Sequence, residues 1–279
     1  YNMGEGGILL NQLNIKKREL NPATVKKKQA MVKTILANLG AVVGGAKPVV
    51  VGTNLEFRPV DIPDETYNAY NMHRENPGWF RSRLARNADL SGLPEGENRF
   101  EGVLYSVPEF KTSIVPSVIM LRGSGTQVQA KKVEGIKVGR QADALFFLHT
   151  YNKGRGVQRY ERALAAGNRK KADPENPPVL FRYRVNYADG QGMEVPVRWN
   201  EGVSHWLQQN PRPLQQAQVA WIAPVEGHEG WQTTVYSMQW NNPRTDVPIK
   251  SIDILPATGR RAQRLGAPAV IAITTATAP

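Results

Sequence analysis

Aromatic residues with polar neighbours that suit sugar binding occur at several places in this chain of 279 residues. A sugar ring has an apolar face and a rim of hydroxyl groups, so it needs an aromatic platform with hydrogen-bonding side chains nearby. We therefore predict carbohydrate contacts at Trp79, Arg81, Arg83, Asn200, His205, Trp206, His228 and Trp231. The alternative for each tryptophan is a place in the protein core, as we expect for Trp221 and Trp240, which lie in apolar runs.

Basic residues crowd one polar segment, where we predict an anion-binding patch. The patch consists of Arg155, Arg159, Arg162, Arg169, Lys170 and Lys171. The chain carries a net charge of +12, which suits an acidic polysaccharide, a nucleic acid or an anionic surface. Guanidinium groups can hold sulfates or uronates, or a neighbouring domain or subunit. Because no nucleic-acid-binding motif occurs, we disfavour nucleic acid. A solvated surface that maintains solubility is the alternative.

Catalytic chemistry has less support. Glycoside hydrolysis needs two carboxyl groups that flank the scissile bond. The acidic residues near the first long polar segment are scattered among prolines and glycines, as in surface loops: Asp61, Asp64, Glu65, Glu95, Glu97 and Glu101. The motifs HExxH and GxSxG are missing, and the chain has no cysteine, which excludes disulfides, thiolate metal sites and a cysteine nucleophile. We predict no catalytic residue, no metal ligand, and a structural, buried role for His149.

The elements that must position these residues are mostly short strands. Apolar runs separated by turn residues predict strands at Val49–Val51, Leu55–Val60, Val103–Val107, Ser117–Leu121, Val128–Ile136, Ala144–Leu148, Val179–Tyr187, Met193–Trp199, Gln218–Ile222, Thr233–Trp240, Ile249–Leu255 and Ala269–Thr275. Apolar and polar residues alternate along Phe181–Tyr187, and a glycine-containing turn follows, which predicts a hairpin with Met193–Trp199. The segment Arg122–Thr126 lies between two predicted strands, so we expect a second hairpin loop there. So many strands with little helix favour a sandwich or barrel.

Four segments differ from this pattern. Residues 1–40 combine a glycine-flanked apolar run with an amphipathic, lysine-rich stretch, which predicts a strand followed by a helix. Residues 41–48 have the glycines and proline of a linker, so the β-sandwich domain is expected at 49–279. Residues 64–99 carry few periodic apolar positions, and residues 152–178 are rich in Lys, Arg, Asn and Pro, so we expect irregular loops that carry binding surfaces. No run of apolar residues is long enough for a membrane span.

The order of several motifs resembles the galactose-binding-like jelly-roll domains of bacterial multidomain glycoside hydrolases of the β-galactosidase-like type. The motifs are Ala142–Thr150, Phe181–Tyr187, Ala188-Asp189-Gly190, Val195-Pro196-Val197, His205-Trp206, Trp240-Asn241-Asn242-Pro243, Ile249–Asp253 and Ala272-Ile273-Thr274. The resemblance covers roughly residues 50 to 276. Residues 6–40 resemble the last strand and helix of a glutamine-amidotransferase-like domain, which precedes such a sandwich in some of these hydrolases.

The resemblance implies a jelly-roll β-sandwich that is a non-catalytic carbohydrate-binding or accessory module, with arginines that favour acidic glycans. It further implies a poly- or oligosaccharide partner, upstream domains that include a catalytic barrel, and a secreted, cell-surface or periplasmic location in bacteria. It implies no organic cofactor, and it is compatible with a structural calcium held by loop oxygens. Two alternatives stay open: an extracellular structural protein that assembles with copies of itself, and a glycoside hydrolase in its own right.

Overall fold

The computed structural model describes residues 2–3, 6–7, 55–72, 76–82, 88–111, 114–259 and 262–278. The chain divides into two compact units, residues 1–50 and 51–279. In the first unit, β1 (Asn2–Met3) pairs with β2 (Gly6–Gly7) in antiparallel fashion. The rest of the predicted strand–helix segment, the predicted linker at 41–48 and the predicted strand at 49–51 lie outside the described residues.

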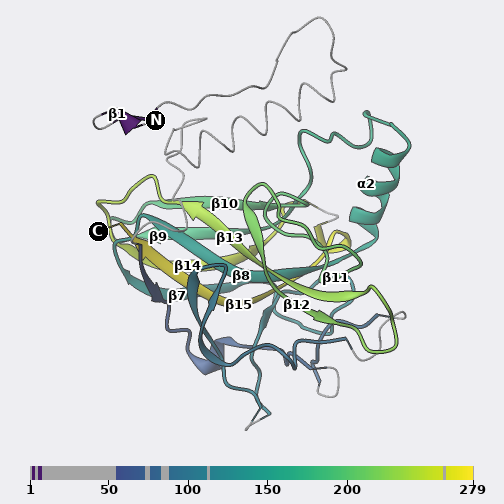
Figure 1. Ribbon diagram of the computed structural model, residues 1–279, viewed down its shortest axis with the longest axis horizontal. Helices are drawn as coiled ribbons and strands as arrows, with labels where there is room; N and C mark the ends of the chain where they lie inside the picture. Colours follow the sequence, from purple (N-terminus) through teal and green to yellow (C-terminus); the bar gives the residue numbers. More distant parts are fainter. Residues whose placement is uncertain are drawn as a thin grey trace, which may run out of the picture. The chain divides into compact units, whose positions relative to one another are not determined.

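The second unit is mainly β, as predicted, and its antiparallel sheets form a β-sandwich (Figure 1). One sheet has four strands in the order β10 (Gly192–Arg198), β9 (Val179–Tyr187), β14 (Ile249–Pro256) and β7 (Val133–Arg140). The other has seven strands, with the central order β11 (Leu207–Gln208), β13 (Gln232–Asn241), β8 (Ala144–Lys153), β15 (Gly266–Thr277) and β3 (Glu56–Pro59). In addition, β12 (Ala217–Pro224) pairs with β13, and β6 (Ile119–Met120) pairs with β15.

The core between the two sheets contains packed aromatic rings among aliphatic side chains. The rings of Phe147 on β8 and Tyr183 on β9 stack with their centroids 3.8 Å apart. His149 is fully buried beside them, as predicted, and its Nε2 lies 3.0 Å from the Gly202 carbonyl oxygen. Because a carbonyl can only accept, Nε2 carries the proton, and Nδ1 accepts from the Tyr183 hydroxyl at 2.8 Å. The predicted hairpin of β9 and β10 is confirmed by their antiparallel register.

The outer face of the seven-stranded sheet is covered by the segment that precedes β6. This segment contains η1 (Asp64–Thr66) and a hairpin of β4 (Gly96–Phe100) and β5 (Val103–Val107). The hydroxyls of Tyr105 and Ser237 lie 2.6 Å apart, and Thr274 Oγ1 donates to the Leu104 carbonyl at 2.7 Å. The described part of 64–99 therefore forms a packed layer over the sheet, with Trp79 and Phe80 buried in it. The described residues between η1 and β4 are mostly irregular, as predicted, but their buried side chains pack against the protein and do not form an exposed binding loop.

The second predicted irregular loop, 152–178, contains a helix. The helix α2 (Arg155–Ala165) directly follows β8 and stands at one end of the sheets (Figure 1). A short helical turn, η2 (Ala262–Arg264), precedes β15 and contacts α2. The two segments of the chain lie close together here, and Gly154 donates its N–H to the Leu265 carbonyl at 2.6 Å. A Cβ at Gly154 would lie 2.5 Å from the Arg264 carbonyl oxygen, so only glycine fits.

The segment Arg122–Thr126 is not a hairpin loop, and that prediction is wrong. The preceding strand, β6, belongs to the seven-stranded sheet, whereas the following strand, β7, belongs to the four-stranded sheet. The segment therefore connects the two layers. Ser124 donates its N–H to the Gln263 carbonyl at 3.0 Å, which fixes the connection beside η2.

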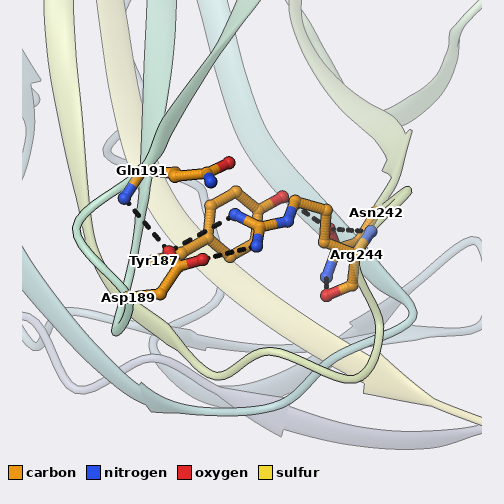
Figure 2. Close-up of polar contacts among 5 residues, drawn as sticks. All are labelled: Tyr187, Asp189, Gln191, Asn242 and Arg244. Atoms are coloured by element: carbon orange, nitrogen blue, oxygen red, sulfur yellow. Dashed lines mark hydrogen bonds and ion pairs between the residues drawn. The ribbon is translucent and has the colours of Figure 1, made fainter.

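Residues from three of the motifs that carry the resemblance, Tyr187, Asp189 and Asn242, meet in one polar cluster, which Figure 2 shows. Arg244 forms an ion pair with Asp189 in the β9–β10 turn, with 2.5 Å between Nη2 and Oδ2. Its guanidinium also lies 4.6 Å from the centre of the Tyr187 ring. The Tyr187 hydroxyl donates to Asn242 Oδ1 at 2.6 Å, and Asn242 Nδ2 donates to the Ala142 carbonyl at 2.7 Å. The cluster ties the turn to the chain after β13, which gives these residues a structural role.

Candidate functional site

A pocket of about 650 Å³ lies where α2 meets the strand ends. Its volume falls within the usual range for small-molecule sites in proteins. It is lined by Ser82, Lys153, Glu161, Trp199, Asn200, Ser204, His205, Leu207, Gln208, Gln209, Asn210, Arg212, Pro213, Leu214, Trp231 and Tyr236. Three of the residues predicted to contact sugar therefore line it together: Asn200 and His205, which are close in the sequence, and Trp231, which comes from the turn before β13.

One wall of the pocket is the segment 208–214, which the Tyr236 side chain holds in place. Gln208 Nε2 donates to the Tyr236 hydroxyl at 2.8 Å and to the His205 carbonyl at 2.7 Å. Leu214 then donates its N–H to the Ala217 carbonyl at 2.7 Å, where β12 begins. Because Tyr236 is fully buried in β13, it anchors this proline-rich wall to the rigid sheet. Burial is also the main cause that raises the Tyr236 pKa, so the hydroxyl stays neutral.

A charged pair forms the side of the pocket next to α2. Lys153 Nζ, at the end of β8, lies 3.1 and 2.9 Å from the two carboxylate oxygens of Glu161 on α2. The same ammonium lies 5.8 Å from the centre of the Trp199 ring. Both charged side chains are about two-thirds shielded from solvent. Water therefore weakens their attraction less than it would at an open surface, and the pair links the helix to the sheet.

His205 is held with one ring nitrogen towards the protein. Its Nδ1 lies 3.2 Å from the Tyr151 carbonyl oxygen and 3.3 Å from the Lys153 backbone nitrogen. Its Nε2 has no hydrogen-bond partner among the described residues, so this nitrogen is available to a ligand. Burial, reinforced by the Lys153 charge, lowers the His205 pKa to about 4, and the ring is therefore neutral near pH 7. A neutral imidazole suits hydrogen bonding to a sugar hydroxyl.

Local backbone geometry places the two other predicted residues. Asn200 has a φ of +58°, a conformation that asparagine tolerates better than most residues, in the tight turn between β10 and the next segment. Its N–H donates to the Val203 carbonyl at 2.9 Å. Trp231 ends the turn between β12 and β13, where its N–H donates to the His228 carbonyl at 3.0 Å. Its side chain remains partly exposed, as a stacking platform requires.

The remaining predicted carbohydrate-binding residues lie elsewhere. Trp79 and Trp206 are only 2% and 1% exposed, and their rings contact each other edge-to-face with centroids 5.9 Å apart. In this conformation neither ring can stack on a sugar, because both fill the core. Arg81 and His228 are exposed but do not line the pocket. Arg83 lies outside the described residues.

The predicted anion patch lies on α2 and the turn that follows it. All six basic side chains are exposed. Arg155, Arg159 and Arg162 are spaced by four and three residues, which puts them on one side of the helix. Within the described parts of the chain, none of the six forms an ion pair with an acidic residue. We call this set of Arg155, Arg159, Arg162, Arg169, Lys170 and Lys171 the basic face.

Sequence reasoning missed the charged and amide residues of the pocket. Lys153 and Glu161 come together only because α2 turns back beside β8, and this helix was not predicted. Gln208, Gln209 and Arg212 could have been found, since they form a polar run interrupted by Pro211 and Pro213 between two apolar segments. Such a run is typical of a fixed surface loop.

Comparisons with known proteins give no relative for this site. No protein-family model matches the chain, and no curated protein matches it significantly. In the described ranges, no group of three or more His, Asp or Glu side chains is arranged to hold a metal ion. None of the helices in that part of the chain is both long and apolar enough to cross a membrane. The geometry of the pocket and of the basic face is therefore the basis for any functional conclusion.

Proposed function

We propose that this chain is a non-catalytic carbohydrate-binding module that acts as an accessory domain of a larger glycoside-hydrolase-like protein. One observation carries the proposal: the pocket gathers Asn200 from the turn after β10, His205 from the segment that bridges to β8, and Trp231 from the turn before β13. The partly exposed indole offers an apolar platform, and the amide and imidazole groups offer partners for hydroxyls. The amides of Gln209 and Asn210 line the same pocket and extend this set.

The pocket lining argues for binding rather than hydrolysis. Glu161 is the carboxylate that lines it among the described residues, and the ammonium of Lys153 already pairs with it. Acid–base hydrolysis of a glycosidic bond uses two carboxyl groups, one of them with a raised pKa. The acidic residues that we weighed from the sequence, such as Asp61 and Glu97, belong instead to the layer that covers the sheet and line no part of this pocket.

The direct test is a glycan-binding screen with the full chain, followed by titration of the strongest hits. Trp231→Ala should weaken binding by about tenfold or more, because it removes the platform for the sugar ring. Trp221→Ala is the matched control: it removes another partly exposed tryptophan, which lies on β12 outside the pocket. Equal affinity in both variants and the unmodified chain would show that the pocket is not the binding site.

An assembly role is the second candidate, and one observation favours it. The strand β12 lies at the edge of the seven-stranded sheet, and its Ile222 side chain is 47% exposed. Exposed apolar edge strands can pair with another chain. Native mass spectrometry separates the two roles: a stable multiple of 31.0 kDa that Ile222→Lys dissociates would support assembly.

A further inference from the structure

The charges in the pocket do not cancel. The carboxylate of Glu161 and the ammonium of Lys153 neutralise each other at 2.9 Å, and His205 is neutral near pH 7. Arg212 also lines the pocket, and its guanidinium has no ion-pair partner among the described residues. The pocket therefore presents one uncompensated positive charge, and this charge belongs to a side chain that can form two parallel hydrogen bonds to a carboxylate.

Arg212 is placed firmly enough to act as a recognition residue. Pro211 and Pro213 stiffen the chain on both sides of it. Gln208, four residues earlier, donates to the buried Tyr236 hydroxyl, and Leu214, two residues later, donates its N–H to the Ala217 carbonyl. A cation on such an anchored segment loses less conformational freedom on binding than one on a loose loop.

The basic face adds charge on the opposite side of the same helix. Glu161 faces the pocket and Val157 is buried, whereas Arg155, Arg159 and Arg162 project from the exposed side of α2. Arg169, Lys170 and Lys171 continue this charge in the next turn. The basic face itself offers no aromatic ring for stacking on a nucleobase, whereas proteins that bind single-stranded nucleic acids combine a positive groove with such rings. Their positive field instead suits a chain with repeated carboxylates.

We propose that the glycan bound in this pocket is acidic: a uronate carboxylate pairs with Arg212, and the basic face attracts the rest of the polysaccharide. This inference rests on the proposed carbohydrate-binding function and names its ligand class. Recognition of the carboxylate is local and depends on one guanidinium. Attraction by the basic face is long-range, so it weakens as salt shortens the screening length.

The test compares acidic and neutral oligosaccharides of equal length on the full chain by calorimetry. The probes are oligogalacturonate and oligomannuronate, each with its neutral counterpart. We expect each acidic member to bind at least about tenfold more tightly, and Arg212→Gln to remove that preference by weakening binding of the acidic member far more than binding of the neutral one. The far-ultraviolet circular dichroism and melting temperature of Arg212→Gln should match the unmodified chain, because its side chain is exposed.

A triple variant tests the basic face separately. Arg155→Gln, Arg159→Gln and Arg162→Gln together should flatten the dependence of uronate affinity on salt between about 0.01 and about 0.15 M. The matched control changes Lys137, Arg184 and Lys250 to glutamine, three exposed residues of the four-stranded sheet. It lowers the net charge equally and should leave the salt dependence in place.

Three outcomes would overturn the inference. Equal affinity for acidic and neutral oligosaccharides, unaffected by Arg212→Gln, refutes it while leaving the proposed function standing. Binding of single-stranded DNA as tightly as oligogalacturonate at the same salt refutes it too, because the surface would then be a general polyanion site. If no saccharide in the wider glycan screen binds, the proposed function itself fails.

Discussion

At the scale of single residues, His149 and His205 show how one residue type serves two purposes, in the buried core and in the partly exposed lining of the pocket. His149 uses both ring nitrogens inside the core, to Tyr183 and to Gly202. His205 uses one ring nitrogen for the protein and keeps the other available at the pocket. The sequence context of His149, at the end of an apolar run, was enough to predict its structural role. We predicted a ligand contact for His205 from its residue type alone. The sequence does not show where this residue lies, because its strand partner Tyr151 is distant in sequence.

Burial of His149 makes stability depend on pH. It lowers the pKa from 6.5 to about 4, so protons bind preferentially to the unfolded chain. Stability is therefore complete above about pH 6.5 and falls as the pH drops towards 4, by roughly 3 kcal/mol for this residue. We expect His149→Gln, which can still donate to Gly202, to flatten this part of the curve in urea unfolding. His228→Gln, at an exposed histidine, should change nothing. An unchanged slope in His149→Gln would contradict the assignment.

At the scale of elements, strands were predictable and the helix was not. The residues of β9 alternate between buried and less buried, and its bounds match the predicted Val179–Tyr187. Helix α2 escaped prediction because Val157 is its buried residue, while Leu164 is 40% exposed, so the apolar stripe is too narrow to recognise. Strand β4 also escaped, because its Gly-Glu-Asn-Arg-Phe sequence is mostly polar and is held by pairing with β5.

The segment Arg122–Thr126 lies in close contact with the start of β15, and this contact allows a test at the scale of elements. A Cβ at Gly123 would lie 2.0 Å from the Gly266 carbonyl oxygen, and Gly266 pairs with Lys153 of the pocket. Gly123→Ala should therefore cost about 1–3 kcal/mol of unfolding free energy and weaken ligand binding. At Gly92 the nearest atom to an added Cβ is a Trp221 ring carbon at 3.5 Å, an ordinary contact. Gly92→Ala should thus be neutral, and urea midpoints that shift equally in both variants would disprove the argument.

At the scale of the whole molecule, the positive charge is divided between two units. Eight of the 36 basic residues and two of the 24 acidic residues lie in the first 50 positions, so each unit carries half of the net +12. The lysines of the first unit are therefore a competing source of any attraction to anions. The basic face and Arg212, in contrast, belong entirely to the second unit. Composition alone predicted an anionic partner, and it could not distinguish between these two sources.

A chain limited to residues 51–279 separates them. The aromatic core of the sandwich and its sheet pairings lie within this range, so we expect it to unfold cooperatively with nearly the melting temperature of the full chain. It loses half of the net charge but keeps the pocket, so uronate affinity and its salt dependence should both persist. If the shortened chain folds and binds but its salt dependence disappears, the attraction comes from the first 50 residues. If it does not fold, those residues complete the sandwich core, and the division into two units does not correspond to two folding units.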